Sequence, residues 1–191
     1  MGMMRDKKTF QTLFFLALPT MLEHLLSTLM QYVDTAMVGR LGADATAAVS
    51  TTTTITWLTG SLCASVAVAV LTMVATASGA KQFDRVRKVA ANALILSTVT
   101  GAVISLVSIV LSPFIPVWMG IDASVQKMAS LYFLIISIPG VFRSFCIVLG
   151  AAVRATHDTK NPMFISLSGN GLNVVLNILL IYTLHLGVTG A

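Results

Sequence analysis

The sequence predicts an all-α membrane protein, a polytopic bundle of about five transmembrane helices. Of its 191 residues, 56% are hydrophobic and only 10% are charged. A soluble domain carries about 25% charged residues, because its surface must face water. The apolar residues gather into five stretches, each long enough to cross a bilayer, which takes about 20 residues at ~1.5 Å of rise each. Most lysines and arginines lie outside these stretches.

The five predicted helices follow one another along the chain. They cover residues 11–38, 45–77, 89–111, 128–153 and 162–186. The first follows a basic segment, as in a signal peptide, but its apolar run exceeds the ~7–15 residues of such a peptide. We therefore predict that this helix is retained. Pro162 suits the first turn of the fifth helix, where a missing N–H costs nothing.

The basic residues alternate between the two sides of the predicted bundle. The N-terminus and the second and fourth connections hold nine of them: Arg5, Lys7, Lys8, Lys81, Arg85, Arg87, Lys88, Arg154 and Lys160. The first and third connections hold only Arg40 and Lys127. Cytoplasmic loops carry the excess of basic residues, so we predict a cytoplasmic N-terminus and an outer position for Ala191.

This alternation also explains the net charge of +5 by topology, so we expect the lipid bilayer as a partner and no nucleic acid. The expected location is the plasma (inner) membrane, as a multi-pass protein. The remaining basic residue, Arg143, lies within the fourth predicted helix. It either pairs with an acid or extends its charged head toward the cytoplasmic surface.

The first predicted helix carries a polar stripe on an otherwise apolar surface. Glu23 and Asp34 are eleven residues apart, which returns to the same face within about 20° and separates them by about 16 Å along the axis. Ser27 and Gln31 lie near that face. Acids inside a membrane helix usually face protein or a wet cavity and are functional candidates. The alternatives are that Glu23 is paired with His24 or a neighbouring helix, and that Asp34 caps the helix at the interface.

The fifth predicted helix carries a second polar stripe, within an arc of about 60°. Its members are Ser166, Asn170, Asn173 and Asn177. Unpaired amides are costly in hydrocarbon, so this face must meet polar groups or water. Asparagine can orient a carboxylate or offer its oxygen to a hard cation. The alternative is that these residues only hydrogen-bond neighbouring helices together.

Other features concern helix shape. Pro19 is expected to kink the first helix and act as a hinge, and Pro139-Gly140 to kink the fourth. Ser97, Gly101 and Ser105 are spaced four apart, which predicts a seam of close helix approach.

No cofactor, metal site or enzyme activity is expected. The chain has no glycine-rich phosphate loop, no Ser/His/Asp set and no metal-ligand spacing, and Cys63 and Cys146 are isolated within apolar segments.

Several segments together resemble the multidrug and toxic compound extrusion (MATE) family. The first helix contains Leu18-Pro19 and then VDTAMVGRLG at residues 33–42. The fourth connection reads RATHDTKNPM at residues 154–163, close to the family pattern R-A-x-G-D-T-K-x-P-M. The run NVVLN at residues 173–177 is similar to the family's fifth-helix asparagine motif, and the last six residues resemble the entry to its sixth helix.

The resemblance implies one six-helix lobe, here without its sixth helix, of a twelve-helix antiporter. Such transporters export small organic cations and other toxic amphiphiles in exchange for H⁺ or Na⁺, so a C-terminal lobe is expected as a missing partner. The resemblance assigns the coupling and substrate cavity to Asp34 and Asn173. Two positions depart from the pattern: His157 replaces a glycine, and Asn177 stands where one branch of the family has aspartate, which leaves Asp34 a weaker proton partner.

Two other functions stay open at this point. One is a flippase for lipid-linked precursors from the same broad superfamily, which should have a more basic cavity than Arg143 alone provides. The other is a membrane fragment without transport activity, because half of a pseudo-symmetric transporter lacks the second lobe that alternating access requires.

Overall fold

The computed structural model describes residues 7–184 and 187–190, and within them every regular element is a helix, as the sequence predicts. The helices are α1 (Lys7–Gly39), α2 (Ala43–Gly79), α3 (Phe83–Leu111), α4 (Ile115–Trp118), α5 (Ala123–Ser137), α6 (Gly140–Arg154) and α7 (Lys160–Asn177). A π-helical turn, Ile178–Thr183, extends α7, and a 3₁₀ turn, Gly187–Gly190, follows.

The helices begin earlier than their apolar stretches do. α3 starts six residues before the predicted position, and α2 starts two residues before it. Asp44 and Asp84 lie in the first turns of these helices, where an acid interacts favourably with the positive end of the helix dipole. A count of apolar residues misses such polar first turns.

The helix predicted at 128–153 is two helices in the structure. α5 ends at Ser137, α6 begins at Gly140, and their axes differ by 49°. Pro139 lacks an N–H, so the carbonyl of Ile135 loses its usual donor at the break. The kink expected at Pro139-Gly140 is therefore present, and it is sharp enough to end one helix and begin another.

By length and composition, three described helices can cross a membrane: α2, α3, and α7 with its π-helical extension. The bent pair of α5 and α6 adds a fourth span when it is counted as one. The five spans of the sequence prediction are reached only when α1 is included. α1 has 33 residues but carries Glu23 and Asp34 on its polar stripe.

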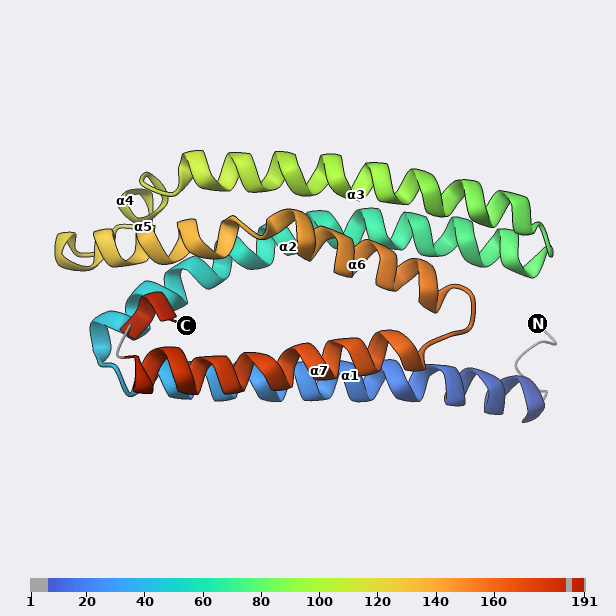
Figure 1. Ribbon diagram of the computed structural model, residues 1–191, viewed down its shortest axis with the longest axis horizontal. Helices are drawn as coiled ribbons and strands as arrows, with labels where there is room; N and C mark the ends of the chain where they lie inside the picture. Colours follow the sequence, from blue (N-terminus) through green and yellow to red (C-terminus); the bar gives the residue numbers. More distant parts are fainter. Residues whose placement is uncertain (1–6, 185–186, 191) are drawn as a thin grey trace.

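The helices form two groups that lie side by side (Figure 1). The four-helix group consists of α2, α3, α5 and α6, in which α6 packs on both α2 and α3. Its main core lies where these three helices meet and includes Val74, Ala93 and Val148. α1 and α7 pack along each other as the second group, the α1–α7 pair.

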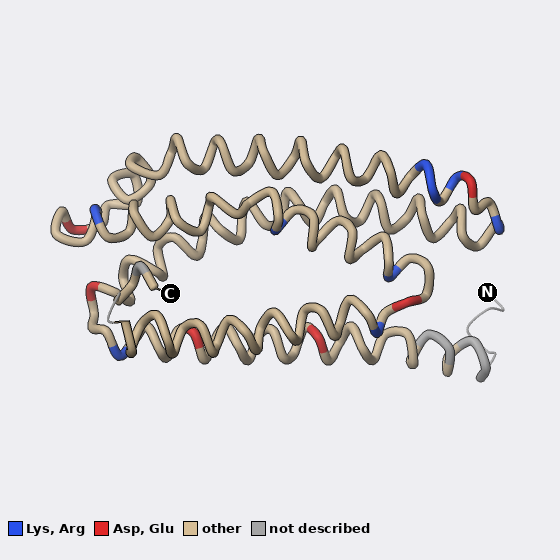
Figure 2. Tube along the Cα trace, viewed as in Figure 1, with Lys and Arg blue, Asp and Glu red and all other residues tan. Residues whose placement is uncertain are grey.

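The basic residues are separated in space as they are in the sequence (Figure 2). The cations of the α2–α3 and α6–α7 connections lie at one end of the molecule, which we call the basic end. The α1–α2 connection, which holds Arg40, and the start of α5, which holds Lys127, lie at the opposite end, which we call the far end (Figure 1). There, a small cluster of Val38, Ala45 and Val188 joins α1, α2 and the 3₁₀ turn.

Candidate functional site

The two predicted polar stripes face each other along the α1–α7 pair. The side-chain amide of Asn177 donates to Oδ1 of Asp34 over 2.8 Å and to Oδ1 of Asn173 over 3.2 Å. In the other orientation of the Asn173 amide, its nitrogen takes the place of that oxygen, and it donates to both oxygens of Asp34 instead, at 3.1 and 3.2 Å. The carboxylate therefore lies against two amides of the facing helix.

This cluster of Asp34, Asn173 and Asn177 is enclosed on one side and open on the other. Asn177 is 4% exposed, Asp34 is half-buried, and Asn173 is exposed. A carboxylate with neighbouring amide oxygens can bind a proton or a hard cation such as Na⁺. No group of three or more His, Cys, Asp or Glu side chains suited to a metal ion occurs among the described residues.

Of the other residues of the two stripes, Asn170 and Ser27 hydrogen-bond to each other, whereas Gln31 does not join them. Asn170 donates to the hydroxyl of Ser27 over 3.0 Å, which is a second link between α1 and α7. Gln31 is exposed, and its side chain makes no hydrogen bond to another described residue. A role for Gln31 in the cavity therefore stays a prediction.

Glu23 lies apart from the Asp34 cluster. Both of its carboxylate oxygens accept from one guanidinium nitrogen of Arg154, over 2.7 and 2.9 Å. The predicted pairing with a neighbouring helix is the one observed, and His24 is not its partner. The sequence placed Arg154 in a connection, whereas α6 extends through it and turns its side chain toward α1.

Pro19 lies inside α1, which continues as one helix from Lys7 to Gly39. Its ring removes the donor that the carbonyl of Phe15 would normally receive. The proline therefore marks a weak point in α1, and its role as a hinge stays a prediction.

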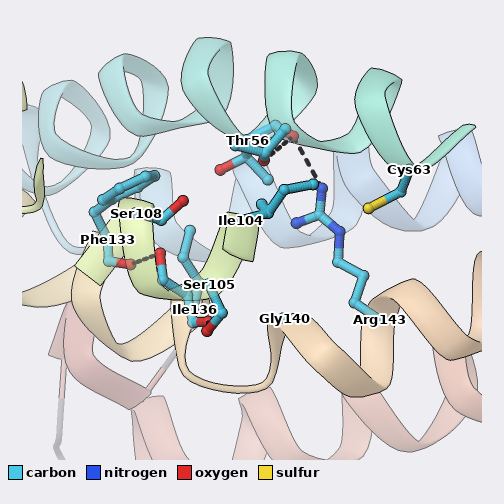
Figure 3. Close-up of a pocket in the computed structure, with 11 residues that line it drawn as sticks. Thr56, Cys63, Ile104, Ser105, Ser108, Phe133, Ile136, Gly140 and Arg143 are labelled. Carbon is cyan, nitrogen blue, oxygen red and sulfur yellow. Dashed lines mark hydrogen bonds between the residues drawn. The ribbon is translucent and has the colours of Figure 1, made fainter. Parts of the chain in front are cut away.

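Arg143 follows neither of its two predicted alternatives. Its guanidinium reaches α2 and donates to the backbone carbonyl of Thr56 over 2.9 Å (Figure 3). It pairs with no acid among the described residues, and its head does not reach the basic end. A cavity of about 20 Å³, lined by Cys63 and several hydroxyls, lies beside it. Room of that size holds roughly one water molecule.

Comparisons with known proteins identify one family. A family model described as MatE matches residues 19–179. A probable multidrug resistance protein NorM of Thermotoga maritima is 27% identical over 175 residues, which are 92% of this chain and 37% of that protein. A protein of the same description from Geobacillus kaustophilus is 30% identical over 177 residues, which are 91% of this chain and 38% of that protein.

The solved structures that this chain resembles are transporters of the same kind. A crystal structure described as MATE in the bent conformation superposes with a TM-score of 0.89 at 27% identity, covering 97% of this chain and 41% of that one. A transporter from Pyrococcus furiosus, whose description refers to a binding pocket of reversed polarity, gives a TM-score of 0.87 at 27% identity, covering 94% of this chain and 40% of that one. The chain therefore spans well under half the length of the proteins that it matches.

Proposed function

Because the chain belongs to the MatE family, we propose that it forms part of a multidrug efflux transporter that exchanges organic cations for H⁺ or Na⁺. The relatives named as multidrug resistance proteins support this class of function. The chain spans 37–38% of their length. We therefore propose that a second lobe completes the transporter, and that it works in the plasma membrane.

The observation that carries the proposal is the contact of Asp34 with Asn177 and Asn173. An ionised Asp34 attracts a cationic substrate to the open side of the cluster. A proton or Na⁺ that binds the carboxylate removes this attraction and releases the substrate. Each ligand must favour a different state for such coupling to exist, and competition for one carboxylate keeps the two ligands from binding together.

Both coupling ions are compatible with this chemistry. A proton needs only the carboxylate, with the two amides as hydrogen-bonding neighbours. A sodium ion needs several oxygen ligands, which Asp34 and the side-chain oxygens of Asn173 and Asn177 offer when their amides turn. Imposed gradients of pH or of Na⁺ across vesicles distinguish the two.

A flippase for lipid-linked precursors has less support. Such a substrate carries anionic phosphates, which call for cations in the cavity. Within the described part of the α1–α7 pair, the face shared by the two helices carries carboxylates and amides. Arg143 lies between α2 and α6 instead, and Arg154 is paired with Glu23.

The proposal is tested by replacing Asp34 with Asn, which keeps the shape but removes the charge. In vesicles that hold the chain together with its second lobe, we expect ethidium efflux to fall at least about tenfold, because the residue would no longer exchange ions. Asp44→Asn is the matched control: it makes the same change at an exposed acid in the first turn of α2, and it should leave efflux unchanged.

Efflux by the Asp34→Asn protein at the unaltered rate, with the same ion dependence, would show that the coupling role is wrong. The non-transporting alternative is decided by the same assay on the unaltered 191-residue chain alone. Absence of any efflux would favour a fragment that needs its second lobe.

A further inference from the structure

Among the side chains that the structure describes, which leave out those of residues 7–9, 12, 13 and 189, the contact between Glu23 and Arg154 is the single hydrogen-bonded link between the two helix groups. The other side-chain bonds between different helices stay inside one group: Arg143 with Thr56 in the four-helix group, for example, and Asn177 with Asp34 in the α1–α7 pair. Glu23 and Arg154 instead join α1 to the last residue of α6.

The position of this link matters because of how each helix is attached. At the basic end, α7 is tied covalently to α6 by the short connection 155–159. α1 is tied covalently to the four-helix group only at the far end, where residues 40–42 lead into α2. Away from that covalent link, the ion pair is the polar contact among the described side chains that holds the middle of α1 against the four-helix group.

The partial burial of the two charges makes the loss of this ion pair costly. The side chain of Glu23 is 11% exposed and that of Arg154 is 25% exposed, so solvent screens the two charges only in part. Removing one partner leaves the other charge uncompensated in a poorly hydrated site, which is strongly unfavourable. The Nε of Arg154 is buried without a hydrogen-bond partner, so this guanidinium depends on Glu23 for its neutralisation.

We propose that Glu23 and Arg154 are positioning residues: their ion pair latches the middle of α1 to the last residue of α6 and thereby sets the position of Asp34. α1 runs without interruption from Glu23 to Asp34, about 16 Å along its axis. A change of tilt at Glu23 is therefore carried to the Asp34 cluster. The latch follows from the contacts alone, whereas its opening during transport rests on the proposed function.

The latch is tested by spin-label distances in the lipid-reconstituted chain, with Cys63→Ala and Cys146→Ser as the background. Labels at Phe15 on α1 and Ala91 on α3, both exposed, report the distance between the two groups. Labels at Phe15 and Ile165, which is exposed on α7, report the distance within the α1–α7 pair.

We expect Glu23→Gln to lengthen or broaden the between-group distance on the order of 5 Å, about one helical turn. The distance within the pair should stay the same, because Ser27–Asn170 and Asp34–Asn177 still hold it. The charge exchange Glu23→Arg with Arg154→Glu should restore the original distance. Asp84→Asn, an exposed acid at the start of α3, is the matched control and should change neither distance.

The latch is refuted if Glu23→Gln and Arg154→Gln leave the between-group distance unchanged, or if the charge exchange fails to restore it. A change of both distances together would mean general loosening and would refute it as well. If Glu23→Gln does not fold, Arg154→Lys carries the test, because it keeps the charge but shortens the reach and should lengthen the distance in the same sense. None of these readouts depends on transport, so the proposed function can fail while the latch stands.

Discussion

The Asp34 cluster depends on the buried amide of Asn177 more than on the exposed amide of Asn173. Asn177→Ala removes the donor that contacts the carboxylate at 2.8 Å. We expect the free energy of unfolding in micelles to fall by about 1–3 kcal/mol, because a half-buried acceptor loses its partner. Asn173→Ala should cost less, since water can replace its exposed amide. An equal loss for the two variants would contradict this ranking.

Gly101 lies at a close approach of α3 to α6, on the predicted small-residue seam. A Cβ added there would lie 2.8 Å from Cα of Val141 and 2.9 Å from Cβ of Ser144, so backbone would have to shift. Gly101→Ala should therefore lower the free energy of unfolding by about 1–3 kcal/mol, the usual cost of overpacking. Gly169→Ala, in open space on α7, should be neutral or slightly stabilising. Similar melting behaviour of both variants would exclude a tight seam.

At the scale of the element, the start of α7 is held by Asp158 in the preceding connection. The backbone N–H of Asn161 donates to Oδ1 of Asp158, and the side-chain amide of Asn161 donates to Oδ2. These bonds, the backbone one foremost, hold the pKa of Asp158 below its usual value. A carboxyl with a depressed pKa stabilises the fold above its unfolded pKa and loses that contribution as the pH falls through its folded pKa.

We therefore expect hydrogen exchange at the amide of Asn161 to be slow near neutral pH and to lose protection below about pH 4, the ordinary pKa of an aspartate. Asp158→Ala should lose this protection at every pH, because no acceptor remains. Asp158→Asn keeps an oxygen acceptor and should retain most of the protection near neutral pH but not its pH dependence. Unchanged protection in Asp158→Ala would show that Asp158 does not cap α7.

The break between α5 and α6 shows how far a sequence can predict an element. Pro139-Gly140 indicates a kink, because the missing N–H is a local property. The contact made by the neighbouring carbonyl at the break is not local: the hydroxyl of Ser105 on α3 donates to the carbonyl of Ser137, over 2.6 Å. No pattern in either segment pairs Ser105 with Ser137. The short helix α4 was likewise missed, since four residues carry no periodic signal.

In the candidate site too, local properties were predictable from the sequence, whereas tertiary contacts were not. The facing of Asp34 and the asparagines was predictable in outline, because both stripes repeat with the helical period and polar faces in lipid must meet. The partners of Glu23 and Arg143 were not predictable. Each depends on where α6 lies relative to α1 and α2, and on α6 extending through Arg154. Helical periodicity fixes which face a residue occupies, whereas tertiary packing decides what that face meets.

At the scale of the whole molecule, the separation of basic residues into two ends predicts the orientation in the membrane. The α2–α3 connection and the start of α3 lie at the basic end (Figure 2) and hold Lys81, Arg85, Arg87 and Lys88. Such clusters stay in the cytoplasm. A single cysteine at Met119, which is exposed at the far end, should react with a membrane-impermeant maleimide in intact cells. A cysteine at the exposed Gln82 should react only after permeabilisation. The native Cys63 and Cys146 are replaced in both variants, and the replaced chain without a new cysteine is the blank. Labelling of the Gln82 site in intact cells would show that the orientation is inverted, and that the end of α6 at Arg154 faces the outer side of the membrane.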